Sequence, residues 1–213
     1  MHKTINNLNI IENLLKIKVG IIPNIIAVSK TFPANDVLPL VNYGHIHFGE
    51  NKVQESIDKW TDIKLNNDIK LHLVGKLQTN KVKLAIKIFD YIHSLDSEKL
   101  AKKIADEQIK QNKNIKIFIQ INIGNEEQKS GIKTEEVVNF YKYCKNLNLN
   151  IIGLMCIPPV EDNPDLYFKE LQLLNQKLNL QDLSMGMSSD YLKAVENSST
   201  YLRIGSSIFG QRD

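Results

Sequence analysis

Short apolar runs recur along the chain, and each is followed by a segment with helical periodicity. Eight such runs occur, at Ile25–Ser29, His45–Gly49, Leu71–Gly75, Tyr91–Leu95, Ile115–Ile123, Ile151–Ile157, Leu183–Gly186 and Tyr201–Phe209. A run of this length fits a buried strand, and the amphipathic segment after it fits a helix. Strands that alternate with helices pair in parallel through crossover connections. The pattern therefore predicts an α/β protein with a parallel sheet.

The number of units and the start of the chain indicate how that sheet closes. Helical spacing before the first run predicts an extra N-terminal helix, with apolar positions Ile5, Leu8, Ile11 and Leu15. An open doubly wound sheet shows the same alternation, but no glycine-rich dinucleotide fingerprint follows a strand here. Eight units favour a single (β/α)8 barrel of the TIM type over residues 1–213. The second unit is the least regular, because Pro39 interrupts its helical pattern.

Composition and charge narrow the class of protein. Hydrophobic residues make up 42% of the 213 residues and charged residues 24%, the balance of a globular protein. The net charge of +3 arises from lysines scattered among acidic residues, so no basic face for nucleic acid is expected. No apolar stretch approaches the ~18 residues of a membrane span, and no signal peptide is evident. We therefore expect a cytoplasmic protein, with Cys144 and Cys156 as buried thiols.

Polar residues follow the predicted strands at the end where barrel proteins place their sites. Lys30 comes directly after the first strand, and Asn51 follows the second. His45 and His47 have strand spacing and could face one side of the sheet together. Two histidines without a third ligand favour packing or hydrogen bonding over zinc. The mouth of the barrel is therefore predicted to carry a lysine and amides rather than a metal.

The last two strands end in residues that suit a phosphate group. In SMGMSSD, Ser188 follows Met187 and is predicted to begin a helix whose first N–H groups point at the mouth. In RIGSS, Gly205 permits close approach of the backbone, and Ser206 adds a hydroxyl donor. Phosphate sites in such barrels often follow strands seven and eight. The alternative is that Ser188 is only a helix cap and Gly205 only a packing position.

Arginine is rare in this chain, and one arginine completes the candidate chemistry. Arg203 and Arg212 are the only two, so a position that keeps arginine suits a need for its permanently charged fork. Arg203 and Gly205 lie two apart on one strand and should point the same way. An amine at Lys30 near Arg203 has its charged form disfavoured, which suits condensation with a carbonyl group. The combination indicates pyridoxal 5′-phosphate (PLP) or a phosphosugar as ligand, whereas Arg212 is expected at the surface.

Longer motifs give the chain a family resemblance. They are AVSKT around Lys30, FGENKVQE at 48–55, LVGKLQTNK at 73–81, HSLD at 93–96, QKSG at 128–131, GLM at 153–155, LSMGMSSDY at 183–191 and LRIGSSIFGQR at 202–212. Several are long and specific, and they keep family order from about residue 24 to residue 212. In these motifs the sequence resembles the pyridoxal phosphate homeostasis proteins.

The resemblance implies a barrel like the N-terminal domain of alanine racemase, with PLP held on Lys30 as a Schiff base. The cofactor-binding residues that it implies are Lys30, Asn51, Met187, Ser188, Arg203, Gly205 and Ser206. Arg203 matches the position that faces the pyridine nitrogen in related folds, where an arginine keeps that nitrogen unprotonated. Ser206 replaces the more usual Thr and keeps the hydroxyl. Ser198 stands where the family usually has Gly, in a left-handed conformation that costs a serine up to ~1 kcal/mol.

The resemblance also bears on whether the protein is an enzyme or a carrier. Related racemases add a second domain that supplies an opposing base, and this sequence ends soon after the eighth strand. We therefore expect a monomeric PLP homeostasis or delivery protein without substantial catalytic activity, which exchanges PLP with PLP-dependent apoenzymes. A PLP enzyme with weak amino-acid racemase activity and a Schiff-base aldolase for a phosphosugar are the alternatives.

Overall fold

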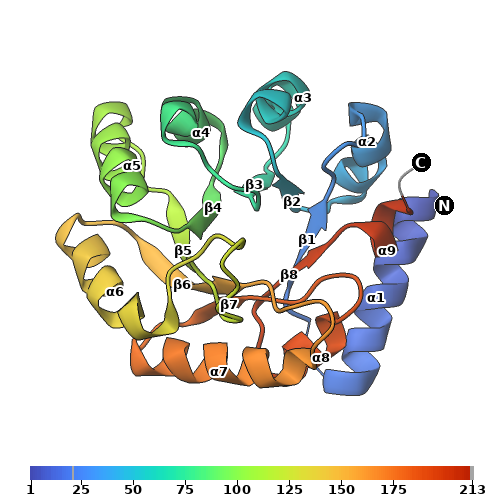
Figure 1. Ribbon diagram of the computed structural model, residues 1–213. Coiled ribbons are helices and arrows are strands. Elements are labelled where there is room, and N and C mark those ends of the chain that lie inside the picture. The colour runs from blue at the N-terminus through green and yellow to red at the C-terminus, as the bar shows by residue number, and fades with distance from the viewer. Residues whose placement is uncertain (21, 212–213) are drawn as a thin grey trace.

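Eight parallel strands close into a barrel in the computed structural model, which describes residues 1–20 and 22–211 (Figure 1). The strands are β1 (Asn24–Val28), β2 (His47–Glu50), β3 (Lys70–Leu73), β4 (Tyr91–Leu95), β5 (Lys116–Ile121), β6 (Ile151–Cys156), β7 (Asp182–Ser184) and β8 (Tyr201–Ile204). Their order around the barrel follows the chain, and β1 pairs with both β2 and β8. The predicted (β/α)8 barrel is confirmed, and the open doubly wound alternative is wrong.

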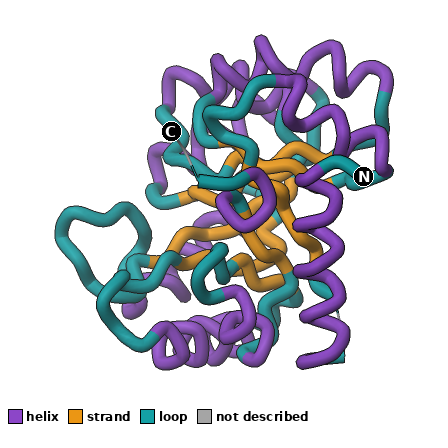
Figure 2. Tube along the Cα trace, turned by 90° about the vertical axis from the view of Figure 1, so that its right-hand side faces the viewer, coloured by secondary structure: helices purple, strands orange, loops and turns teal. Residues whose placement is uncertain are grey.

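Helices form a layer outside the strands, as the side view in Figure 2 shows. They are α1 (Lys3–Val19), α2 (Ala34–Tyr43), α3 (Val53–Asn66), α4 (Val82–Ile88), α5 (Glu98–Gln111), α6 (Val137–Asn146), α7 (Pro164–Lys177), α8 (Tyr191–Glu196) and α9 (Ser206–Phe209), with 3-10 turns η1 (Thr79–Lys81) and η2 (Thr134–Glu136). The predicted N-terminal helix is α1, which contacts α2, α8 and α9. It therefore fills the outer layer between the last and the first unit.

The last strand and the first helix after β1 illustrate how the structure differs in detail from the sequence pattern. The eighth apolar run was expected to continue to Phe209, but β8 ends at Ile204 because Gly205 leaves the extended conformation, with φ −114° and ψ −76°. The end of that run forms the short helix α9 instead. Pro39 lies inside α2, which forms nevertheless. Burial of the apolar face of α2 outweighs the hydrogen bond that Pro39 cannot donate.

The barrel wall divides the apolar packing into two clusters. The larger cluster lies between the strands and the helices and includes Leu202 and Ile204 of β8. The smaller cluster lies inside the barrel and consists of Ile26, Val28, Tyr91, Phe118, Met155 and Tyr201. Successive residues of a strand point to opposite faces, so Tyr201 and Arg203 point inward while their neighbours point outward. Inward positions near the strand ends therefore form the floor of the barrel mouth.

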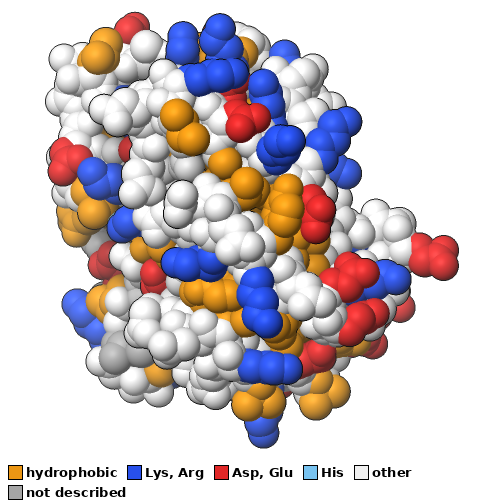
Figure 3. Space-filling model, turned by 90° about the vertical axis from the view of Figure 1, so that its left-hand side faces the viewer, with side chains coloured by type: hydrophobic (Ala, Val, Ile, Leu, Met, Phe, Trp, Pro, Cys, Tyr) orange, Lys and Arg blue, Asp and Glu red, His pale blue; other side chains and the backbone are white. Residues whose placement is uncertain are grey.

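The surface carries charges of both signs. On the face drawn in Figure 3, lysine and arginine side chains are accompanied by acidic ones, with uncharged surface between them. On α5, Glu107 accepts from Lys103 at 3.1 Å and lies 3.7 Å from Lys110. Within residues 1–20 and 22–211, no helix is long and apolar enough to cross a membrane.

Candidate functional site

Lys30 lies in a tight turn directly after β1. The Phe32 N–H donates to the Ser29 carbonyl oxygen at 3.1 Å, which closes a four-residue turn with Lys30 and Thr31 at its centre. Thr31 has a φ of 73°, in the left-handed region that a β-branched residue seldom adopts. Such a conformation persists only where the surrounding structure imposes it. The turn therefore depends on contacts from outside its own four residues.

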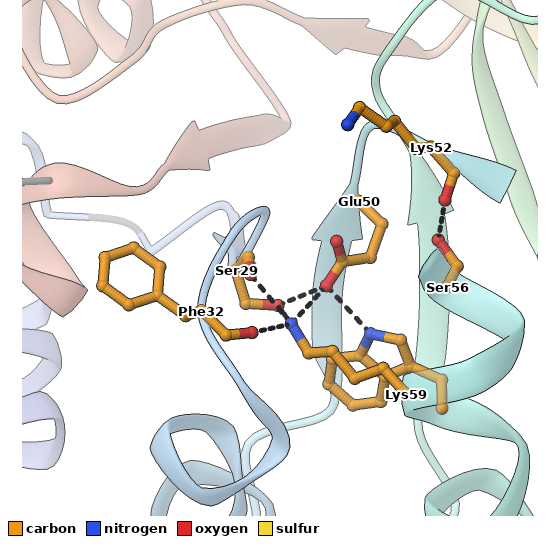
Figure 4. Close-up of polar contacts among 7 residues, drawn as sticks. Ser29, Phe32, Glu50, Lys52, Ser56 and Lys59 are labelled. Carbon is orange, nitrogen blue, oxygen red and sulfur yellow. Dashed lines mark hydrogen bonds and ion pairs between the residues drawn. The ribbon is translucent and has the colours of Figure 1, made fainter. Parts of the chain in front are cut away.

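Lys59, on α3, supplies those contacts (Figure 4). Its Nζ donates to the carbonyl oxygens of Ser29 and Phe32, at 2.8 and 2.7 Å, and so holds both ends of the turn. The same Nζ lies 2.7 Å from Glu50 Oε1, at the end of β2. The Ser29 hydroxyl and the Trp60 indole N–H also donate to that carboxylate oxygen, at 2.7 and 2.9 Å. We call this group (Ser29, Phe32, Glu50, Lys59 and Trp60) the turn clamp, since it fixes the backbone on either side of Lys30.

A cavity of about 390 Å³ lies at the carboxyl ends of the strands, and Lys30 lines it. Its volume is within the range of small-molecule sites. Its lining residues are Val28, Lys30, Phe32, Asn51, Val74, Ile157, Met187, Ser188, Ser189, Arg203, Gly205, Ser206 and Gly210. The seven predicted cofactor-binding residues, Lys30, Asn51, Met187, Ser188, Arg203, Gly205 and Ser206, thus all line one cavity. The apolar walls Val74 and Ile157 lie within the predicted runs Leu71–Gly75 and Ile151–Ile157 and were not among the predicted site residues; in the structure they directly follow β3 and β6.

The turn after β7 differs from the sequence prediction. Ser188 does not begin a helix, because it lies in a turn and α8 starts only at Tyr191. The Asp190 N–H donates to the Met187 carbonyl oxygen at 3.1 Å and the Met187 N–H donates to Asp190 Oδ1 at 2.6 Å, and these bonds close a turn directly ahead of the helix. The Ser188 hydroxyl oxygen accepts from the Ser207 N–H at 3.2 Å. That bond joins the turn after β7 to α9, so two chain segments are held together at the mouth.

The connection from β8 to α9 forms the neighbouring wall of the cavity. A Cβ at Gly205 would lie 3.2 Å from the Val28 carbonyl oxygen, so glycine allows β8 to lie close against β1. Ser206 follows as the first residue of α9 and also lines the cavity. The rings of Phe32 and Phe209 stack with their centroids 5.0 Å apart, which joins α9 to the turn that carries Lys30.

Arg203 reaches the cavity from inside the barrel and is only 6% exposed. Its Nη1 donates to Ser184 Oγ and its Nη2 to the Cys156 carbonyl oxygen, both at 2.8 Å. Burial lowers the pKa of the guanidinium from its ordinary value, but an arginine side chain stays charged in proteins. Ser184 was not among the predicted site residues, because in the sequence it is only a polar residue within the apolar run Leu183–Gly186. Arg212, expected at the surface, lies outside the described residues.

The histidines and cysteines do not form a metal site in the part of the chain that the structure describes. His45 and His47 could share one side of the sheet only as residues of one strand, and β2 begins at His47. His47 Nδ1 lies 2.9 Å from His72 Nε2 inside the barrel, whereas the His45 ring packs edge-on against Phe48. Both cysteines are buried, as predicted, and burial raises the pKa of each thiol to about 12.

Comparisons with known proteins agree on fold and family. The family model described as "Alanine racemase, N-terminal domain" matches residues 5–213. The chain is 38% identical over 198 residues to the pyridoxal phosphate homeostasis protein of Aquifex aeolicus (strain VF5), covering 88% of this chain and 86% of that protein. PipY of Synechococcus elongatus PCC7942, solved without PLP, is 31% identical with a TM-score of 0.88, over 98% of this chain and 100% of PipY. The PipY structure with PLP bound is 32% identical with a TM-score of 0.83, over 93% and 99%.

Proposed function

Since this chain belongs to the pyridoxal phosphate homeostasis proteins, within the family of the alanine racemase N-terminal domain, we propose that it binds PLP on Lys30 as a Schiff base and acts in intracellular PLP homeostasis. The observation that carries this proposal is the single cavity at the barrel mouth. It brings an amine, two serine hydroxyls and a buried guanidinium together from the ends of β1, β7 and β8.

The lysine suits the aldehyde end of the cofactor. PLP supplies an aldehyde, which condenses with Lys30 Nζ to form a C=N bond and release one water molecule. The turn clamp holds the carbonyl groups of Ser29 and Phe32, so the Lys30 side chain starts from a fixed backbone position. A fixed starting point limits the orientations that the amine can take and favours reaction at one place in the cavity.

The ends of β7 and β8 suit the phosphate. Ser188 and Ser206 each add a hydroxyl to the cavity wall, and Gly205 leaves backbone accessible between β8 and α9. Hydroxyl and backbone N–H groups are the usual neutral partners of phosphate oxygens in barrels of this kind. Met187 and Asn51 complete the wall near these groups. We assign the phosphate to this part of the cavity.

Arg203 suits the pyridine nitrogen. A guanidinium only donates hydrogen bonds and keeps its protons at neutral pH, so a pyridine nitrogen that accepts from it stays unprotonated. An unprotonated ring withdraws electrons less strongly, which makes the cofactor a weaker electron sink. Within the described residues, Lys30 and Arg203 are the ionisable groups of the cavity wall. Racemisation needs an acid and a base on the two faces of the substrate carbon, and this wall offers one amine.

These features favour holding over catalysis. We propose that residues 1–213 act as one cytoplasmic domain that stores PLP as a monomer and releases it to PLP-dependent apoenzymes. The reaction that binds the cofactor is reversible, because water returns the amine and the aldehyde. Among the described residues, the cavity wall offers a site for this reversible reaction and, besides Lys30, no further amine, carboxylate or imidazole, which favours holding and exchange of the cofactor.

Visible absorption of the purified protein, titrated with PLP, tests the proposal. We expect a new absorption band and, after borohydride reduction, a covalent adduct that maps to the peptide containing Lys30. Lys30→Ala should lose both signals. Lys52→Ala is the matched control, because Lys52 is an exposed lysine close to the same mouth.

Two outcomes would overturn parts of the proposal. A wild-type protein that stays colourless with PLP, or an adduct that survives in Lys30→Ala, contradicts the assignment of Lys30. Substantial turnover of an amino acid by the PLP-loaded protein contradicts the carrier function and favours the weak racemase. Reduction of an adduct with a phosphosugar, without any PLP band, favours the aldolase.

A further inference from the structure

Three histidines form a hydrogen-bonded row through the inside of the barrel. His47 Nδ1 lies 2.9 Å from His72 Nε2, and His72 Nδ1 lies 2.9 Å from His93 Nε2. His93 Nδ1 in turn lies 2.8 Å from Ser184 Oγ, the same oxygen that accepts from Arg203. We call these residues of β2, β3 and β4 (His47, His72 and His93) the histidine row. It runs from the start of β2 to Ser184, which contacts Arg203 of the candidate PLP site.

Aromatic residues enclose the row. The His72 ring stacks on Tyr91 with centroids 4.1 Å apart, and the His93 ring stacks on Phe118 at 4.4 Å. His72 and His93 are fully buried, and Tyr201 contacts both rings. Burial of a polar group costs free energy unless its hydrogen bonds are made. Both ring nitrogens of His72 and of His93 have a hydrogen-bond partner within the row or at Ser184.

Arg203 determines which nitrogen donates and which accepts in each hydrogen bond of the histidine row. A guanidinium only donates, so Ser184 Oγ accepts from Arg203 and keeps its own proton to donate. The partner of the Ser184 hydroxyl at 2.8 Å is His93 Nδ1, which accepts a hydrogen bond only if that nitrogen carries no proton. A neutral His93 then carries its proton on Nε2 and donates to His72 Nδ1. The same step repeats at His72, whose Nε2 proton points to His47.

The reverse direction is unfavourable. His93 would then donate to a hydroxyl oxygen that already accepts from Arg203, and the Ser184 proton would lose its histidine acceptor. The N–H dipole of the imidazole would also point at the guanidinium charge. The charged groups that act on the row are Arg203 at one end and Lys64, Lys70, Lys116 and Asp90 toward the other. Cations outnumber the acid there, which favours neutral rings throughout.

We propose that His93 and His72 are positioning residues of the PLP site: as neutral imidazoles protonated on Nε2, they orient the Ser184 hydroxyl so that it accepts from Arg203 and holds the guanidinium toward the cavity. This inference rests on the proposed function, because it concerns the arginine assigned to the pyridine nitrogen. The histidine row thereby connects Arg203, through Ser184, with the opposite end of the barrel. His47, at the start of β2, is only partly buried, so the row links solvent there to Arg203.

Nitrogen NMR of the histidine side chains tests the tautomers without any cofactor. The chain contains only five histidines, so ¹⁵N-histidine labelling gives a simple spectrum, assigned with single His→Gln variants. We expect His72 and His93 each to show a protonated Nε2 and a bare Nδ1, unchanged between about pH 5.5 and 8. A protonated Nδ1 on either residue, or titration of both near the ordinary histidine value, would overturn the proposal.

Three variants of the loaded protein test the effect on the site. His93→Leu removes the acceptor of the Ser184 proton, so PLP affinity should fall about tenfold. The pH midpoint of the bound cofactor's absorption should also shift, because Ser184 is no longer oriented toward Arg203, which keeps only its bond to the Cys156 carbonyl oxygen in place. His93→Gln can accept from Ser184 and donate to His72, and we expect affinity within about twofold of wild type. Phe118→Leu is the packing control, since it changes the ring against His93 but removes no hydrogen bond.

The outcomes separate this proposal from the function on which it rests. If His93→Leu, His93→Gln and Phe118→Leu all weaken PLP binding equally, the row is only packing and the inference fails. If the wild-type protein takes up no PLP, the proposed function fails, while the tautomers of the unloaded protein still decide whether the row exists. An unchanged pH midpoint in His93→Leu, with a normal fold by circular dichroism, also contradicts the positioning role.

Discussion

Lys59 Nζ and Glu50 Oε1 lie 2.7 Å apart, and the two side chains are only 11% and 3% exposed. A buried ion pair adds little net stability by itself, because the cost of removing both charges from water offsets their attraction. Here the same ammonium group also binds the carbonyl oxygens at both ends of the Lys30 turn. The pair therefore serves mainly to hold the backbone that presents Lys30.

Replacing Lys59 by methionine separates these contributions. Methionine keeps much of the apolar stem but leaves Glu50 as a buried charge without its cation. We expect the free energy of unfolding to fall by about 3 kcal/mol, measured by urea denaturation. We also expect PLP affinity to fall, by about tenfold in a spectroscopic titration, because the strained turn is no longer held.

Lys52→Met is the control for the loss of an ion pair near the same mouth. The Lys52–Glu55 pair has side chains that are 70% and 56% exposed, so its loss should change the free energy of unfolding by less than about 1 kcal/mol. PLP affinity should stay at the wild-type value. A Lys59→Met protein that binds PLP as tightly as wild type would contradict the positioning role, whatever its stability.

Thr31→Gly tests whether the strain next to Lys30 serves the site. Glycine adopts a φ of 73° without the steric cost that threonine carries, so unfolding should become harder by about 1 kcal/mol. The more flexible turn should at the same time bind PLP less tightly. Thermal denaturation measures the first effect and spectroscopic titration the second. A variant that gains stability and keeps full affinity would show that the strain does not contribute to binding.

The fold could be predicted from sequence where one local feature decides the structure. The apolar run Tyr91–Leu95 coincides with β4 because polar residues bound it on both sides. The run predicted from Tyr201 is too long, since apolar residues return at Ile208 and Phe209 and do not show that the backbone turns at Gly205. The site residues were predictable for a simple geometric reason. Carboxyl ends of parallel strands converge in a closed barrel, so residues after different strands meet.

The supports of the site were not predictable, because each depends on partners from different elements. His47 and His72 are 25 residues apart, and His72 and His93 are 21 apart. Their contact follows from the register of three neighbouring strands, which the sequence pattern does not contain. Nothing in the sequence distinguishes Lys59 from the other lysines of the chain. It reaches the turn after β1 only because α3 packs beside that turn in the folded protein. The start of the helix was predicted too early, at Ser188, for a related reason, since the bonds between Met187 and Asp190 close a turn before the helix begins.

Ser198→Gly is the counterpart of the threonine variant at a position away from the cavity. Ser198 has a φ of 68° just after α8, as the family pattern of glycine at this position indicates. Relief of this conformation should raise the free energy of unfolding by about 0.5 kcal/mol, after the exposed hydrogen bond from Gln172 is lost. PLP affinity should not change. A loss of affinity here would mean that backbone changes near β8 reach the site in general, which would weaken the interpretation of Thr31→Gly.

Stability should fall as the solution is acidified below neutral pH, because of the buried histidines. Burial, with Arg203 acting on His93 and with His93 acting on His72, holds both pKa values well below the ordinary 6.5. Below that value the unfolded chain takes up protons that the folded protein does not, so each histidine lowers the free energy of unfolding by about 1.4 kcal/mol per pH unit. Urea denaturation at a series of pH values from about 7.5 down to 5 measures this slope. His93→Gln has one such histidine fewer, so the slope of its free energy of unfolding against pH should correspond to about one proton fewer. An equal slope in the two proteins would mean that His93 is protonated in the folded state.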